Sequence, residues 1–303
     1  MSENAIRVGA AETVAETPAL SVGKGPSAWR TTLLMARVTF REAARRKILW
    51  TATLAGFVFL AFFWTALHFV LKNAARQNTV SLREGVVMMT TMVLYAGSMM
   101  TSLMAVLTCC DTLAGEIASG TIHAIATKPV ERWCLVFGKW IGFAGMLTLY
   151  VGLIEGGTIV LSWLQSGYLA HHVLAVLSLV WLQAVVLLGV TMAASASFSS
   201  LTSGAVSLGL YGLAFVGGWI EQFGALRHLQ ALVDLGILSS LIMPSDALWR
   251  RAAFVFQPPL IGSLGVSPFG SNLVPSNAMV VYAAIYAVLA ILLAQLLFSR
   301  RDL

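Results

Sequence analysis

Long apolar runs alternate with short polar segments along the whole chain. A transmembrane helix needs about 20 predominantly apolar residues. Four runs reach this length without a charged side chain, a fifth is slightly shorter and uncharged, and a sixth is longer and contains Lys139 and Glu155. This pattern predicts an all-α integral membrane protein with six transmembrane helices. The expected spans cover about residues 48–71, 86–110, 133–163, 173–197, 203–220 and 279–298.

The residues before the first span predict a tail and a helix at the membrane surface. Residues 1–28 are small and polar, which favours a disordered tail, and residues 29–303 are expected to form the membrane domain. Between Trp29 and Lys47, an apolar stripe lies beside a stripe of arginines at helical spacing. Such a helix is typical of the membrane interface, where its aromatic side chains enter the lipid and its arginines reach the phosphates.

The segment between the fifth and sixth spans, residues 221–277, is expected to lie outside the membrane, on the side away from the tail. Its first apolar stretch is too short to cross the bilayer and stops at Pro244. Ser245 and Asp246 are expected to cap a second short helix, and the remainder is rich in Gly, Pro, Ser and Asn and predicts a loop. The two short helices would form either an external cap or re-entrant elements buried in protein.

The composition supports a membrane protein and sets its orientation. Only 11% of the residues are charged and 58% are hydrophobic, whereas a soluble domain carries roughly a quarter charged residues. No basic stripe with interleaved aromatics is present, so no nucleic-acid partner is expected. Thirteen Lys and Arg residues fall on the side of the tail and six on the other. The positive-inside rule then predicts a multi-pass protein of the cell (inner) membrane with cytoplasmic termini.

The three cysteines are too few for a disulfide framework. Cys109, Cys110 and Cys134 fall at the expected cytoplasmic ends of the second and third spans, where thiols stay reduced. We interpret them as small buried residues, with a metal or redox role as the alternative, and expect no metal site.

The third span carries five glycines on one face. At about 100° per residue, they fall within an arc of about 80°. Small residues on one face let helices approach closely in lipid, so this face is predicted to pack within the bundle or between subunits. The glycines are Gly138, Gly142, Gly145, Gly152 and Gly156.

Glu155 is the candidate intramembrane polar site. It lies about 100° from the glycine face, in the outer half of the third span. An intramembrane carboxylate is costly and is a candidate for function by default. Two interpretations stay open: Glu155 lines a polar pathway, or it is hydrogen-bonded or neutralised near the outer interface.

A charged hairpin at residues 111–132 connects the second and third spans. As a helix, it places Glu116, Ser119 and His123 within about 60° of one another. Pro129 stops the helix before the next span begins. The hairpin therefore predicts a short cytoplasmic helix that presents a carboxylate and an imidazole. Geometry alone leaves a solvated loop without a partner as an equal alternative.

Three motifs in and after this hairpin resemble the ABC-2 family of ABC-transporter permeases. Glu116 is followed after three residues by Gly120-Thr121-Ile122, then by Thr127-Lys128-Pro129-Val130-Glu131-Arg132 and by Gly138-Lys139-Trp140-Ile141-Gly142. Ile122 replaces the usual Leu of the family pattern, and Thr127-Lys128 replaces the usual Ser-x. The ending of the chain, the interfacial helix and the six spans extend the resemblance to about residues 29–303.

The resemblance implies a pair of membrane subunits, as a homodimer or a heterodimer, that work with cytoplasmic ATPase subunits. The hairpin helix would be the coupling helix that docks on the ATPase, mainly for export. ATP and Mg would bind to the partner, because this sequence contains no GxxxxGK[ST] phosphate loop. We therefore expect a non-catalytic permease among membrane lipids. The implied ATPase-coupling interface comprises Glu116, Ser119, Gly120, Thr121, His123, Pro129 and Arg132.

Two other classes of function compete with this interpretation. A secondary transporter or channel would work without an ATPase, but such proteins often show repeated halves, and no convincing repeat is found here. An intramembrane enzyme would need a motif such as HExxH or GxSxG, and neither occurs in the sequence. The sequence does not identify the transported substrate.

Overall fold

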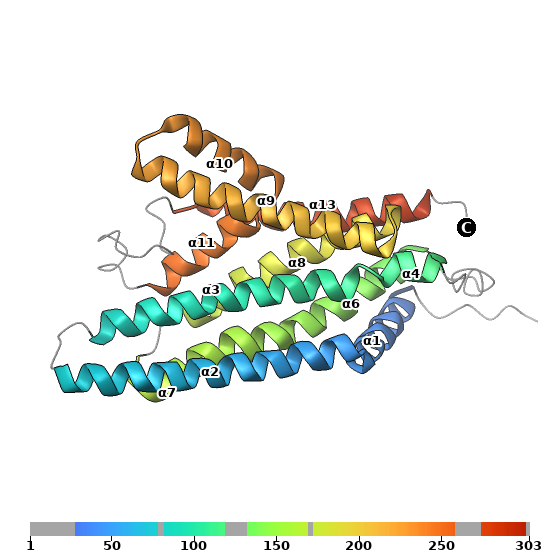
Figure 1. Ribbon diagram of the computed structural model, residues 1–303. Coiled ribbons are helices and arrows are strands. Elements are labelled where there is room, and N and C mark those ends of the chain that lie inside the picture. Colours follow the sequence, from blue (N-terminus) through green and yellow to red (C-terminus); the bar gives the residue numbers. More distant parts are fainter. Residues whose placement is uncertain (1–27, 78–81, 119–131, 169–171, 258–273, 301–303) are drawn as a thin grey trace, which may run out of the picture.

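A computed structural model describes residues 28–77, 82–118, 132–168, 172–257 and 274–300, and the regular elements in them are all helices (Figure 1). Six of these helical segments are long and apolar enough to cross a membrane, which confirms the predicted number. The expected disordered tail lies outside the described residues. The spans are α2 (Lys47–Gln77), α3 (Leu82–Cys109), α6 (Arg132–Val151) continued by η1 (Gly152–Gly156) and α7 (Gly157–Ser166), α8 (Val173–Ser197), α9 (Ser200–Leu226) and α13 (Asn277–Ser299).

Helix α8 forms the centre of the bundle. It carries no charged side chain, and it packs against α3, α6, α9 and α13. Leu188 and Met192 join one core cluster with the third span, and Leu187 joins a second cluster with α11 (Ser245–Phe256). A helix that is apolar around its whole circumference is suited to the centre of a membrane bundle, and most of α8 between Leu179 and Ala196 is buried.

Helix α1 (Ala28–Arg45) lies across α6 at one end of the bundle (Figure 1). Its packed face consists of small residues, because a backbone-to-backbone approach leaves no room for long side chains. Trp29 is 62% exposed, as a lipid-facing aromatic residue would be, whereas Phe40 packs against the core cluster. The sequence pattern did not indicate the packed face, which comprises Thr32, Ala36, Thr39 and Ala43.

Two short helices follow the fifth span. Helix α10 (Gln230–Ile242) folds back along α9, and α11 turns by 104° relative to α10. By length and composition, α10 and α11 together could also count as a seventh, broken span. Helix α11 is mostly buried and packs against α8, α9 and α3.

The predicted cap of α11 is wrong. The helix begins at Ser245 itself, and its N-cap residue is Pro244, without a side-chain hydrogen bond to the backbone. Asp246 instead forms an ion pair within its own helix, between its Oδ2 and the Nε of Arg250 at 2.9 Å. A buried arginine competes for the carboxylate that would otherwise cap the helix.

Candidate functional site: the base of the α4 hairpin

Helix α4 (Thr112–Ala118) begins the charged hairpin and follows α3 after a break at Cys110 and Asp111. It lies at the same end of the bundle as α1 and the C-terminal end of α13, which we call the α4 end (Figure 1). Leu113 is fully buried in the core cluster of the third span. The base of α4 is thus embedded in the membrane domain, although the hairpin continues beyond the described residues.

A serine from another helix caps the first turn of α4. The Oγ of Ser195, on α8, accepts hydrogen bonds from the backbone N–H groups of Leu113 at 3.2 Å and Ala114 at 3.0 Å. The first N–H groups of a helix have no partner within it, and burial without one is costly. Ser195 is fully buried, so it supplies the partner that water would otherwise provide.

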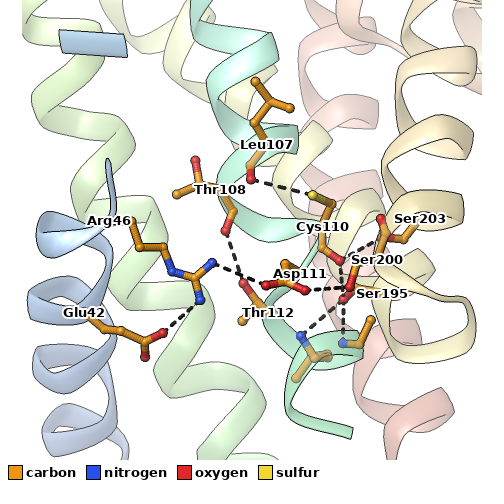
Figure 2. A network of polar contacts seen from close by, with 12 residues as sticks. Glu42, Arg46, Leu107, Thr108, Cys110, Asp111, Thr112, Ser195, Ser200 and Ser203 are labelled. Atoms are coloured by element: carbon orange, nitrogen blue, oxygen red, sulfur yellow. Dashed lines mark hydrogen bonds and ion pairs between the residues drawn. The ribbon is translucent and has the colours of Figure 1, made fainter. Parts of the chain in front are cut away.

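The break before α4 is held by two more serines, as Figure 2 shows. The carbonyl oxygen of Cys110 accepts hydrogen bonds from Ser195 at 3.0 Å and from Ser203 at 2.8 Å. Ser200 donates a hydrogen bond to Oδ1 of Asp111 at 2.6 Å. Because Ser200 and Ser203 lie in the first turn of α9, the start of the fifth span is fixed to the start of the hairpin.

Two basic residues complete the network. Arg46, between α1 and α2, lies 4.0 Å from Oδ2 of Asp111 and donates to Glu42 at 2.8 Å. Lys139, on α6, is buried, and its Nζ donates to the backbone carbonyl of Thr112 at 3.3 Å. Together with the serines, these contacts connect the base of α4 to α6, α8, α9 and the junction of α1 with α2.

The contacts at the base of α4 are suited to transmitting a displacement between helices. A force applied to α4 would be transmitted to these helices, because no flexible segment separates α4 from the hydrogen bonds at its first turn. Sequence reasoning missed the network. A usable signal was the serine-rich turn at residues 195–203, since serines between two spans can bond to backbone groups of a neighbouring helix.

The predicted coupling residues fall mostly outside this described base. Glu116 lies in the last turn of α4 and Arg132 opens α6, but the positions of both side chains lie outside the described part. The remaining predicted residues lie outside the described residues altogether: Ser119, Gly120, Thr121, His123 and Pro129.

The five glycines of the third span have different surroundings. A Cβ at Gly138 would lie 2.9 Å from the carbonyl oxygen of Thr32, and one at Gly142 would lie 2.7 Å from that of Ala36. A Cβ at Gly145 would make an ordinary contact of 3.8 Å with Phe40. The first two glycines therefore allow α1 to lie directly on α6.

Gly152 and Gly156 face a different environment. A Cβ at either position would meet nothing within 4 Å. Both residues line an apolar groove of about 880 Å³ between the third span and α2, with Phe57 and Trp64 on its far wall. In this single chain, these glycines keep a groove open, whereas those on α6 bring helices together.

Glu155 is fully buried in the π-helical turn η1, and neither of its oxygens has a hydrogen-bond partner among the described residues. The three cysteines are free, with Cys109 and Cys134 buried. Within the described part of the chain, no group of three or more His, Cys, Asp or Glu residues could hold a metal ion.

A buried ionic cluster lies between α9 and α11, and the sequence analysis did not predict it. The Nη2 of Arg250 lies 2.7 Å from Oε2 of Glu221, and its Nε lies 2.9 Å from Oδ2 of Asp246. Burial raises the pKa of Asp246 to about 6, against the attraction of Arg250. Although burial opposes its charge, hydrogen bonding to Glu221 and the charge of Asp246 raise the pKa of Arg250.

The fold and the hairpin base define a helical membrane protein whose spans are connected to a charged hairpin at one end. A family model described as "ABC-2 family transporter protein" matches residues 33–303. The chain therefore belongs to the ABC-2 family of transporter proteins, and it is a membrane protein of the permease type, which generally works with an ATPase subunit. No curated protein matches the chain.

Proposed function

We propose that this chain is the membrane subunit of an ABC exporter, driven by a separate cytoplasmic ATPase that docks on the 111–132 hairpin. The observation that carries the proposal is the hydrogen bonding of the α4 base. Ser195 and Lys139 attach α4 to α8 and α6, and Ser200 attaches the preceding Asp111 to α9. These connections would let a movement of the hairpin reach three spans of the bundle.

The proposed mechanism is transmission of force. ATP and Mg²⁺ would be bound and used entirely within the partner, whose closure would press on α4. Glu116 would pair with a basic group of the ATPase, and Gly120 would allow close approach of the two surfaces. Pro129 and Arg132 would hold the angle between the hairpin and α6. The serine contacts would then pass the displacement to α8 and α9.

The proposed assembly contains two permease subunits, identical or different, in the cell (inner) membrane. The α4 end, with both termini, would face the cytoplasm. The excess of basic residues on this side supports the orientation, because cytoplasmic segments carry more Lys and Arg. In this orientation, α1 would lie at the inner membrane surface, with its exposed Trp29 in lipid.

The test is co-purification with candidate cytoplasmic ABC ATPases from the same organism. Both chains are expressed together, and binding and ATP-driven transport are compared for the wild type, Glu116→Ala and Glu84→Ala. Glu84 is an exposed carboxylate in the first turn of α3, far from α4 along that helix, so it is the matched control. We expect Glu116→Ala alone to reduce ATPase binding and uncouple hydrolysis from transport.

Two results would overturn this proposal. Equal coupling in the wild type and Glu116→Ala would remove the hairpin from the mechanism. Flux through the purified chain without nucleotide would favour the alternative, a secondary transporter or channel.

The orientation has a separate test. Ser119→Cys is made in a chain whose Cys109, Cys110 and Cys134 have first been replaced. In intact cells, the new thiol should be shielded from a membrane-impermeant reagent and should react only after permeabilisation. Labelling in intact cells would reverse the orientation without affecting the fold.

A further inference from the structure

A carboxyl group without a hydrogen-bond partner among the described residues lies inside the third span. Glu155 is 0% exposed. Among the described residues, neither Oε1 nor Oε2 has a hydrogen-bond partner. This differs from the buried carboxylates Glu221 and Asp246, which both pair with Arg250. Glu155 therefore needs its own explanation.

The neighbouring helix leaves a space for the Glu155 carboxyl group. On α3, Gly97 stands where any larger residue would collide with it, because a Cβ there would lie 2.9 Å from Oε1. The carbonyl oxygen of Gly97 already accepts a hydrogen bond from Thr101 at 3.0 Å. The contact between α3 and η1 thus encloses the carboxyl group without giving it a donor.

The backbone around Glu155 is unusual as well. Residues 152–156 form a π-helical turn inside an otherwise α-helical span. Such turns are rare and occur frequently at functional sites, because the wider turn changes the direction of the side chains that follow. Thr158 donates to the carbonyl of Ile154 at 2.7 Å, so this backbone oxygen has a side-chain donor while the carboxyl group has none among the described residues.

Within the described part of the chain, no charged group faces the carboxyl group. The turn η1 packs against α2, α3, α6, α7 and α8, and α7 and α8 contain no ionisable residue. The ionisable group that interacts with Glu155 is Tyr150, whose hydroxyl donates to the carbonyl of Ala52 at 3.3 Å. Lys139 lies about 24 Å away along the helix, at 1.5 Å per residue. The other charged side chains described on these helices are exposed at their ends: Lys47, Lys72 and Glu84.

An ionised carboxylate in these surroundings would be buried without a counter-charge. Such a group takes up a proton instead, since the neutral acid avoids the cost of removing a charge from water. A metal ion is a poor alternative, because no group of three ligating residues exists in the described part of the chain.

We propose that Glu155 is a proton-binding site, protonated in the conformation described here and deprotonated when α3 and η1 separate and admit water. The proton then stabilises the closed contact between the second and third spans. By linkage, the closed contact weakens as pH rises, by up to about tenfold per pH unit for one proton. The proposal is independent of the ATPase and of the transported substrate.

Infrared spectroscopy of the purified full chain tests the protonation state. At pH 8, where Asp246 with its pKa of about 6 is ionised, the wild type should show a carbonyl stretching band of a protonated carboxyl group, and Glu155→Gln should lose it. Glu42→Gln is the control, because Glu42 is an exposed carboxylate paired with Arg46, and it should leave the band unchanged. A band that persists in Glu155→Gln would overturn the proposal. So would failure of this variant to fold, since glutamine has the shape and neutrality of the protonated acid.

Hydrogen exchange tests the opening. The exchange rate of amides in α3 around Gly97 is compared between the wild type and Glu155→Gln at each pH, so that the intrinsic chemistry cancels in the ratio. As pH rises, the wild type should open more often than the variant, and the ratio should increase by up to about tenfold per pH unit. A ratio that does not change with pH would show that the proton is not linked to the contact of α3 with η1.

Discussion

The hydroxyl of Ser195 on α8 lies 3.0 Å from the backbone nitrogen of Ala114 on α4. The fourth span therefore completes the first turn of a helix that follows the second span. A helix whose cap belongs to another element cannot unwind or shift without moving that element or losing the bond. This relationship makes α4 part of the bundle instead of an appendage, and it leads directly to a prediction.

Replacement of Ser195 by alanine should loosen the first turn of α4. The N–H groups of Leu113 and Ala114 would be left without a partner in a buried site, at a cost of about 1–3 kcal/mol. Hydrogen exchange with mass spectrometry should therefore show faster exchange in peptides that contain residues 112–118. Ser178→Ala is the control on the same helix, because the hydroxyl of Ser178 donates to the carbonyl of Ala175 in its own helix. Equal protection of α4 in the wild type and Ser195→Ala would contradict the assigned cap.

The number of spans followed from the apolar runs alone, but their ends depended on contacts that the sequence hides. The predicted span at residues 173–197 coincides with α8, because polar residues flank an uninterrupted apolar run. The next prediction stopped at residue 220, before Glu221, whereas α9 continues to Leu226. The helix continues past Glu221, whose charge is compensated by Arg250. Arg250 is 29 residues further along the chain, so the local sequence does not reveal this pair.

The candidate site was likewise predictable from the sequence only in part. The hairpin and Glu155 could be selected from sequence, because charged residues are conspicuous among apolar spans. The serines that hold α4 could not, since serine is also a common small residue at helix contacts in membranes. The glycine face of the third span was visible as a stripe. Its separation into Gly142 against α1 and Gly156 along a groove depends on where the neighbouring helices lie.

Gly142→Ala should destabilise the protein, and Gly156→Ala should not. A Cβ at Gly142 would lie 2.7 Å from the carbonyl oxygen of Ala36, so α1 must move away from α6. A Cβ at Gly156 meets nothing within 4 Å, and alanine is favoured over glycine in a helix by roughly 1 kcal/mol. Thermal unfolding in detergent should show a lower midpoint for the first variant and an equal or higher one for the second. Equal losses would mean that α1 does not pack on α6 as described.

Removal of the Arg250 charge should destabilise the protein, and part of the lost stability should return as pH falls. Arg250→Met leaves Glu221 and Asp246 buried without a cation, and breaking a buried pair from one side costs roughly 3–5 kcal/mol. Burial already raises the pKa of Asp246 to about 6, and loss of Arg250 removes an attraction that opposes this rise. The folded variant therefore binds protons more tightly than the unfolded chain, and its stability should increase as pH falls.

Unfolding midpoints at pH 5 and pH 8 measure this effect for Arg250→Met. Arg251→Met is the control, because Arg251 donates to Pro275 and to Asn277 instead of to a carboxylate. Its loss of stability should be the same at both pH values. A deficit of Arg250→Met that does not shrink at pH 5 would show that the two carboxylates are not the source of the instability.

The contact between Ser200 and Asp111 should be measurable as a coupling energy. Ser200 donates to Asp111 at 2.6 Å, and the two residues are 89 positions apart. The bond therefore joins the start of α9 to the residue before α4, two segments that are distant in the sequence. In a double-mutant cycle, Ser200→Ala and Asp111→Ala should be non-additive by about 0.5–3 kcal/mol, because Ser200→Ala removes the donor and Asp111→Ala removes the acceptor of the same bond. The matched cycle pairs Ser200→Ala with Gln165→Ala, whose amide donates to Trp64 on α2, outside this network. That second pair should be additive to within about 0.5 kcal/mol. Additivity in the first cycle would mean that Ser200 does not hold Asp111, which would leave the hydrogen bond of Ser203 to the Cys110 carbonyl to attach the start of the fifth span to the hairpin.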